Sequence, residues 1–185
     1  MSDFKAISAT TKTLERLLVA KLAIPVETLL APHDLAVMTP LVGIFMYRVE
    51  INPFLANLDW KRTSSTQLVA PPIGLNMHYL ITPYGPDLIE IQKTLGEVIR
   101  VFHEYPVIDA ADPLLSPDLA GMTEELRIFP RPLPLNDMLE LWKSFEKVPY
   151  RLALTYEVSA VLIDSTISRS VLPVQERNIE LIPLR

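Results

Sequence analysis

The sequence contains no cysteine among its 185 residues. This absence excludes disulfide bonds, thiolate metal ligands and cysteine nucleophiles. The longest apolar runs, such as residues 41–47, are far shorter than the roughly 20 residues that a membrane span requires. The polar N-terminal segment also lacks the apolar core of a signal peptide. We therefore expect synthesis in the cytoplasm and no membrane partner.

Glycine is scarce and proline is abundant, with 5 and 17 residues respectively. Few glycines leave little material for flexible or phosphate-binding loops. Each proline fixes a backbone angle and removes a hydrogen-bond donor, so the many prolines predict stiff segments joined at fixed corners. The net charge of −5 gives no reason to expect nucleic acid or anionic lipid as a partner. With 49% hydrophobic and 21% charged residues, the chain is typical of a globular protein.

Catalytic and metal-binding motifs are missing as well. The three histidines have no spacing typical of metal ligands, and GxSxG, Walker A and GxGxxG sequences are absent. One alternative remains, in which His78 and either Asp109 or Asp112 form a small-ligand or hydrolytic site in a pocket. The competing interpretation makes His78 an interface residue and the two aspartates loop or helix-cap residues. We expect no enzyme activity, cofactor, metal or small-molecule substrate.

Hydrophobic periodicity divides the chain into helices and strands. Three stretches have apolar residues at helical intervals and predict helices at 3–22, 87–105 and about 135–145. Alternating or short apolar stretches predict strands at 26–30, 45–51, 73–82, 125–129 and 150–163. Residues 54–72 are predicted to form a loop. The order predicts an α+β (loosely α/β) fold, with a single mixed or antiparallel sheet and about three helices packed on it. We expect one domain over residues 1–185, whose tail (about 165–185) has strand-like pieces and can reach a neighbour.

The segment 150–163 is the longest predicted strand, at 14 residues. Ordinary strands have about 3 to 10 residues. Its alternation predicts that Leu154 and Tyr156 face a core, whereas Arg151 and Glu157 face outward. Beyond residue 160 both sides are apolar, so we hypothesise that Val161 and Ile163 pack against a neighbouring subunit.

Five segments occur in an order that resembles a known family: AISATTKTLERLL, FMYRVEINPFLAN, LNMHYLITPYG, YPVIDAAD and PYRLALTYEVSAVLID. The chain is similar over residues 6–164 to the tail-terminator, or cap, subunits of extracellular contractile injection systems. These are phage-tail-like particles of the antifeeding-prophage and virulence-cassette type. The tail of this chain departs from members that have long C-terminal extensions.

The resemblance implies a structural protein that forms a homohexameric ring at the end of the tube and sheath. Such a ring terminates the inner tube and anchors the last sheath layer, so the expected partners are other copies, tube subunits and sheath subunits. Assembly would take place in the cytoplasm, before the particle is released or retained in the cell.

Several residues are candidates for contacts within such a ring. Arg48 and Glu50 on one predicted strand, and Arg151 and Glu157 on another, are candidate partners of opposite charge across an interface. The expected loop offers an anchor of Trp60, Lys61 and Arg62, because tryptophan and arginine are enriched in binding hot spots. The proline-rich stretches 69–73 and 129–134 are candidates for blunted sheet edges that prevent further growth.

Overall fold

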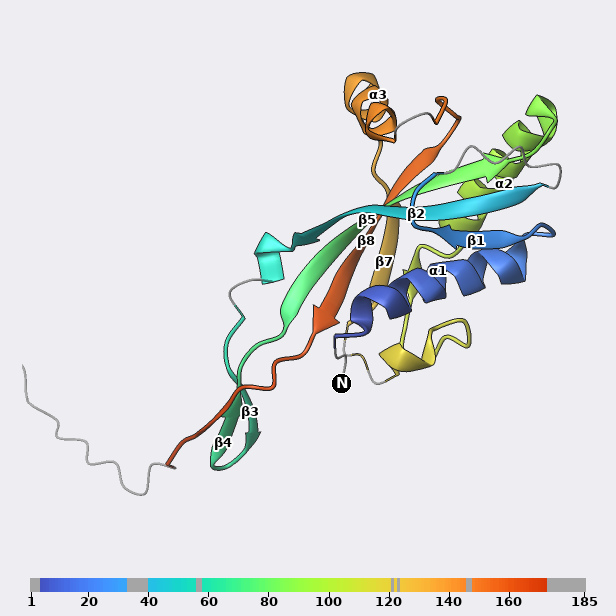
Figure 1. Cartoon of the computed structure of the whole chain (residues 1–185). Coiled ribbons are helices and arrows are strands. Elements are labelled where there is room, and N and C mark those ends of the chain that lie inside the picture. The colour runs from blue at the N-terminus through green and yellow to red at the C-terminus, as the bar shows by residue number, and fades with distance from the viewer. Residues whose placement is uncertain are drawn as a thin grey trace, which may run out of the picture.

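The computed structural model describes residues 4–32, 40–55, 58–120, 122, 124–145 and 148–172. A six-stranded sheet has the order β1-β2-β5-β8-β7-β6, and a separate three-stranded sheet has the order β3-β4-β9. In Figure 1 the large sheet carries α1 and α2 against it, while the small sheet projects from one end as an arm. The helices are α1 (Ala6–Lys21), α2 (Leu88–Glu104) and α3 (Leu135–Ser144), and two short 3-10 turns are η1 (Pro53–Leu55) and η2 (Pro117–Leu119).

The strands of the large sheet are β1 (Val26–Leu29), β2 (Leu41–Ile51), β5 (Ile73–Tyr84), β6 (Val107–Ile108), β7 (Leu126–Pro130) and β8 (Leu154–Ile163). β1 runs parallel to β2, and the other neighbours are antiparallel. The small sheet consists of β3 (Lys61–Ser64), β4 (Gln67–Val69) and β9 (Ser168–Ser170). The predicted α+β class, three helices and mixed sheet are confirmed.

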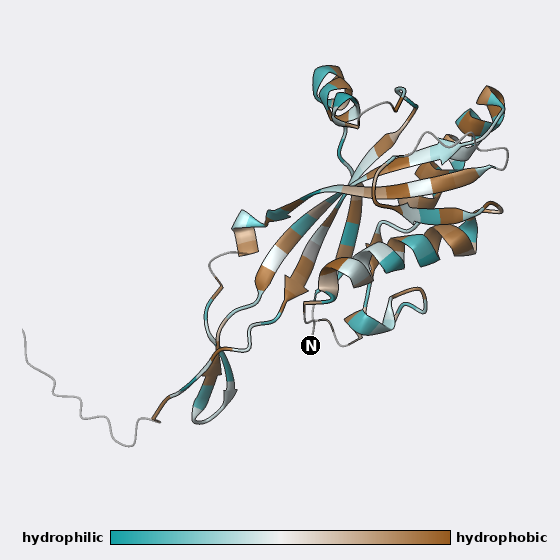
Figure 2. Ribbon diagram, in the orientation of Figure 1, coloured by the Kyte–Doolittle hydropathy of each residue, from teal (hydrophilic) through white to brown (hydrophobic). Residues whose placement is uncertain are grey.

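One face of the large sheet holds the main core. Side chains of β5 at alternate positions, Met77, Tyr79 and Ile81, join apolar residues of α1 and α2 there. Figure 2 shows the corresponding alternation of apolar and polar residues along the strands. In α1 the buried Thr10 and Thr13 donate their hydroxyl hydrogens to the carbonyls of Ala6 and Ala9, which satisfies them within the apolar layer.

The predicted beginning and end of the second helix are explained by two residues. Asp87 is the N-cap, and its carboxylate accepts hydrogen bonds from the backbone N–H groups of Ile89 and Glu90. Pro106 follows the helix and cannot continue it. Among the described residues, no helix is both long and apolar enough to cross a membrane.

Two sequence predictions about strands are wrong. The segment 54–72, expected as a loop, forms the β3–β4 hairpin, and β9 completes a second sheet beside it. The long strand begins at Leu154 and not at Tyr150, so it has 10 residues. The region just before it, including the exposed Leu152, is not paired into the ladder. One of the strand-like pieces predicted in the tail, at residues 179–181, lies outside the described residues, as does all of the chain beyond residue 172.

Candidate assembly surfaces

A group of charged residues lies on the other face of the large sheet, centred on His78. Strand pairing places Arg48 and Glu157 on either side of it. The Glu157 carboxylate lies 3.9 Å from Nδ1 of His78 and 3.6 Å from Nε of Arg131. Glu50 lies 3.6 Å from Nε2 of His78 and pairs with Arg48. The two carboxylates and the two arginines thus balance one another around the histidine.

This placement corrects the prediction that Glu157 faces solvent. Glu157 is only 5% exposed, and Thr155 is buried beside it on the same face. The sheet is covered on both faces here, so alternation does not separate core from solvent. Arg151 lies over the ring of Tyr84, with its guanidinium carbon 5.3 Å from the ring centre. Burial also raises the pKa of the neighbouring Tyr47, which lies against His78.

The hypothesised contact through the end of β8 is also corrected in part. Val161 is 1% exposed and pairs with Leu75 of β5, which places it in the core of its own chain. Ile163 is partly buried and packs against the same core. Val161 and Ile163 are therefore both part of, or packed against, the core of their own chain.

The alternative site of His78 with an aspartate is not assembled. Asp109 accepts a hydrogen bond from the backbone N–H of Ala111, and Asp112 from that of Leu114, so both act as loop residues. His78 contacts glutamates instead. Within the described part of the chain, no group of three or more His, Asp or Glu side chains is arranged to hold a metal ion.

The arm contains the predicted anchor residues. Trp60 lies just before β3, and the guanidinium of Arg169 from β9 stacks on it, with 4.3 Å between the guanidinium carbon and the ring centre. Arg62 donates a hydrogen bond to the carbonyl of Ser65 within the hairpin. Lys61 and Arg62 are exposed. The structure thus brings the three predicted residues onto one projecting element, and Arg169 is an addition that the sequence did not suggest.

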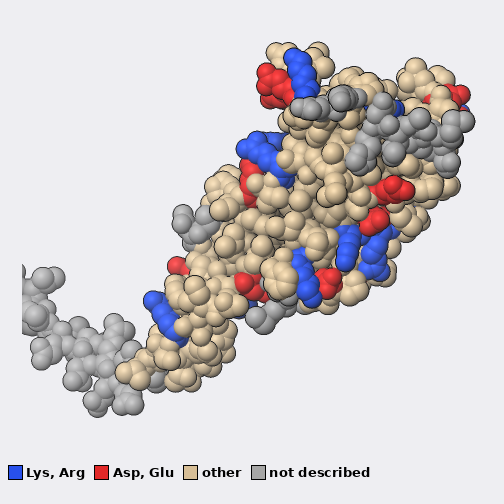
Figure 3. Space-filling model, viewed as in Figure 1, with Lys and Arg blue, Asp and Glu red and all other residues tan. Residues whose placement is uncertain are grey.

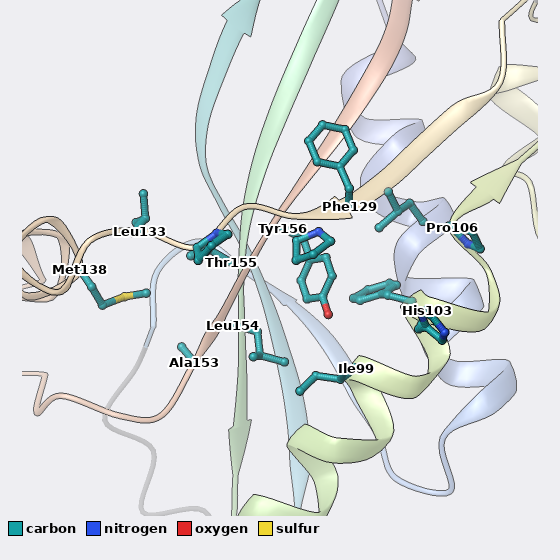
Figure 4. A pocket seen from close by; sticks show the side chains of 14 residues that line it. Ile99, His103, Pro106, Phe129, Leu133, Met138, Ala153, Leu154, Thr155 and Tyr156 are labelled. Carbon is teal, nitrogen blue, oxygen red and sulfur yellow. The ribbon is translucent and has the colours of Figure 1, made fainter.

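An apolar groove of about 680 Å³ lies where β7 and β8 separate. Figure 4 shows Ile99 and His103 of α2 on one side, Met138 of α3 on another, and Leu154 and Tyr156 of β8 between them. Pro130 and Pro132, from one of the predicted proline-rich edges, also line it. This groove was not predicted from the sequence. The apolar side of the second helix was a signal for it, because Ile99 lies on that side but remains exposed outside the core.

Charge on the visible surface is mixed. In Figure 3 the basic and acidic side chains are interleaved, and no broad patch of one sign forms on this face. On helix α2 such charges form pairs, Lys93 with Glu90 and Arg100 with Glu104. Such a surface lacks the continuous basic stripe that is typical of nucleic-acid binding.

A family model described as the Pvc16 N-terminal domain matches residues 9–177. The chain belongs to the Pvc16 N-terminal domain family. A search of curated proteins found no match.

Two solved structures share the fold of this family member. One is the sheath/tube terminator in a cryo-EM structure of an extracellular contractile injection system (PVC) in the extended state: TM-score 0.70, 19% identity, 97% of this chain and 64% of that chain covered. The other is the anti-feeding prophage cap, the AFP tube terminating cap: TM-score 0.63, 17% identity, 98% of this chain and 62% of that chain covered. The present chain thus spans a little under two thirds of each.

Proposed function

We propose that this protein is a structural cap that terminates the inner tube of a contractile injection particle and anchors its last sheath layer. The single observation that carries the proposal is the shared fold: nearly the whole chain superimposes on two chains that are themselves a sheath/tube terminator and a tube-terminating cap. The proposed partners are copies of this chain, tube subunits and sheath subunits. Assembly would occur in the cytoplasm before the particle is released.

The surface of the isolated chain supports a role in assembly. Large apolar residues remain exposed on α2, on α3 and on the segment that leads into β8, namely Leu88, Ile89, Ile99, Leu135, Leu139, Tyr150 and Leu152. Residues of these three regions border the groove described above. Extensive exposed apolar surface on a folded protein is typical of a protein interface. A reaction centre is not needed to account for these residues.

We propose that six copies form a closed ring. A ring requires heterologous contacts, in which two different surfaces of the same chain meet and the rotation closes. The arm and the groove are candidate surfaces for contacts with other subunits of the particle. The ring would have a mass of about six times the 20.9 kDa of one chain.

The test has two readouts. Light scattering should give the mass of a hexamer in solution, and particles from cells that lack this protein should have uncontrolled lengths under the electron microscope. Particles of normal, uniform length without the protein would contradict the proposal.

A variant in the groove provides a matched comparison. Ile99→Glu places a charge in the apolar groove and should reduce incorporation into particles, whereas Gln92→Glu, on an exposed part of the same helix, should not. Circular dichroism should show that both variants remain folded. Equal incorporation of the two would remove the groove from the assembly surfaces.

A further inference from the structure

The outer edge of β2 is open along its second half. β1 pairs only with residues 42–45 of β2, whereas β5 pairs with β2 from Leu41 to Ile51 on the other side. Among the described strands, none pairs with the outer edge of residues 46–51. Figure 1 shows β1 beside the first half of β2, while the second half continues toward η1. A row of backbone N–H and C=O groups at such an edge is a template for another strand.

Apolar side chains at this edge are left uncovered. Val49 pairs with Met77 and Ile51 pairs with Leu75, so each shares the face of the main core with its partner. Met77 is fully buried, but Val49 is 40% exposed and Ile51 is 64% exposed. The apolar layer therefore ends abruptly at β2, and a further strand would continue it.

The edge is held in a fixed shape. The backbone N–H of Asn52 donates to the carbonyl of Gly74 at 2.8 Å, and its side chain donates to Asn76 at 2.9 Å. The same side chain accepts a hydrogen bond from the N–H of Phe54, which fixes the turn after the strand. A preformed edge loses little conformational entropy on binding. Residues 46–51 contain no proline, and the register shift between Met46 and Arg48 lies at their start, so the open edge beyond it runs from Arg48 to Ile51.

We propose that residues 178–182 of one copy add as a strand to this open edge of β2 in the neighbouring copy. The inference rests on the proposed ring and names the contact that closes it. The segment Asn-Ile-Glu-Leu-Ile alternates as an edge strand requires, with Ile179 and Leu181 on one side, and Pro183 ends it. The tail and the open edge of β2 are different surfaces of one chain, so each copy donates its tail to one neighbour and accepts the tail of another.

Opposite charges favour one register of the added strand against β2. In the antiparallel arrangement with Ile179 opposite Val49, Glu180 lies opposite Arg48 and Asn178 lies opposite Glu50. The side chain of Arg48 is 64% exposed, so it can reach a second carboxylate besides Glu50. Antiparallel or parallel registers that place Glu180 opposite Glu50 would set like charges together, which is unfavourable. The parallel register that keeps Arg48 opposite Glu180 would place Pro183 opposite Ile51, where it cannot donate to the ladder.

The absence of native cysteine allows a direct test by cross-linking. Chains carrying Val49→Cys and chains carrying Ile179→Cys, with different tags, are mixed under denaturing conditions, refolded together and oxidised. Opposed residues of an antiparallel pair lie about 4.5–5.5 Å apart between Cα atoms, which suits a disulfide. We expect a covalent dimer that contains both tags, and a ladder up to the hexamer when both substitutions are in one chain.

A second pair of variants tests the register. Arg48→Glu and Glu180→Arg should each weaken ring association by up to about fivefold, and the double variant should recover it. As the matched control for the cross-link, Ile179→Cys is combined with Ile99→Cys in the groove, which should give no covalent dimer.

The outcomes separate this contact from the ring itself. A disulfide within one chain, or a cross-link to Ile99→Cys in the groove, would overturn the proposal. A hexamer without the Val49–Ile179 cross-link would overturn it too, while leaving the proposed function standing. A monomer would contradict both.

Discussion

The two faces of the six-stranded sheet are built in different ways. The face toward α1 and α2 is a continuous apolar core, and its few polar groups are neutral and hydrogen-bonded, as Tyr79 is to Thr11. The face toward α3 has a small apolar cluster of Leu80, Met138 and Trp142, beside the charged group around His78. The first arrangement is the larger one and stabilises the chain on its own, whereas the second is small and borders apolar residues of α3 that remain exposed, Leu135 and Leu139.

We therefore expect substitutions on the two faces to have different effects. Substitutions on the α1 and α2 face should mainly change the free energy of unfolding of the single chain. Substitutions at exposed positions of the α3 side should leave that free energy nearly unchanged and alter assembly. Each experiment below compares a substitution with a matched control.

The largest effect is expected for Leu17→Ala in α1. Leu17 is fully buried in the main core, so truncation removes its apolar contacts and leaves a cavity. We expect a loss of about 2–5 kcal/mol in the free energy of unfolding, measured by urea denaturation. Leu135→Ala is the matched control, because Leu135 is exposed at the start of α3; it should change the free energy by less than about 0.5 kcal/mol. Similar losses for both would show that the two faces do not differ.

A smaller effect is expected for Glu157→Gln in the charged group. The substitution keeps the size of the side chain but removes the charge that faces His78 and the partly exposed Arg131. We expect a loss of about 1–3 kcal/mol in chemical denaturation, because the charged group around His78 loses the charge of its most buried carboxylate. Glu125→Gln is the control, since its pair with Arg127 is exposed and should contribute no more than about 1 kcal/mol. A stable Glu157→Gln protein would mean that the charges on this face do not hold the strands together.

Local signals in the sequence predicted the first face well. Helical periodicity found α1 and α2, because each has apolar residues at helical intervals; those of α1 and of the second half of α2 contribute to the core. Asp87 and Pro106 placed the ends of α2 through a cap and a missing donor, which are local effects. Periodicity, caps and prolines act on residues that are close in the sequence, so their effects can be predicted from the sequence alone.

Three other features could not be predicted in the same way. Glu157 looked like a solvent residue, because alternation cannot show that Arg131, 26 positions away in the chain, covers it. The β3–β4 hairpin was missed because its strands are short and β3 is polar and exposed, and it gains a third strand only from β9, about 100 residues later. The groove depends on where β7 and β8 separate. All three arise from contacts between distant segments, and periodicity does not report these.

The smallest effect concerns the hydrogen bond between the Tyr79 and Thr11 hydroxyls, 2.9 Å apart on the first face. Burial raises the pKa of Tyr79 well above its usual value of about 10. The neutral phenol is therefore favoured in the folded protein. The contribution of Tyr79 to the free energy of unfolding should be constant below about pH 10. It should fall as the pH rises further, because Tyr79 ionises first in the unfolded chain. Tyr79→Phe should lose about 1 kcal/mol at pH 7 but show a shallower alkaline decline. Thr11→Val should lose a similar amount and retain the decline, since Tyr79 stays buried, so denaturation curves at pH 7 and pH 10.5 separate the hydrogen bond from the burial. An unchanged alkaline decline in Tyr79→Phe would show that the first face does not depend on keeping its polar groups neutral.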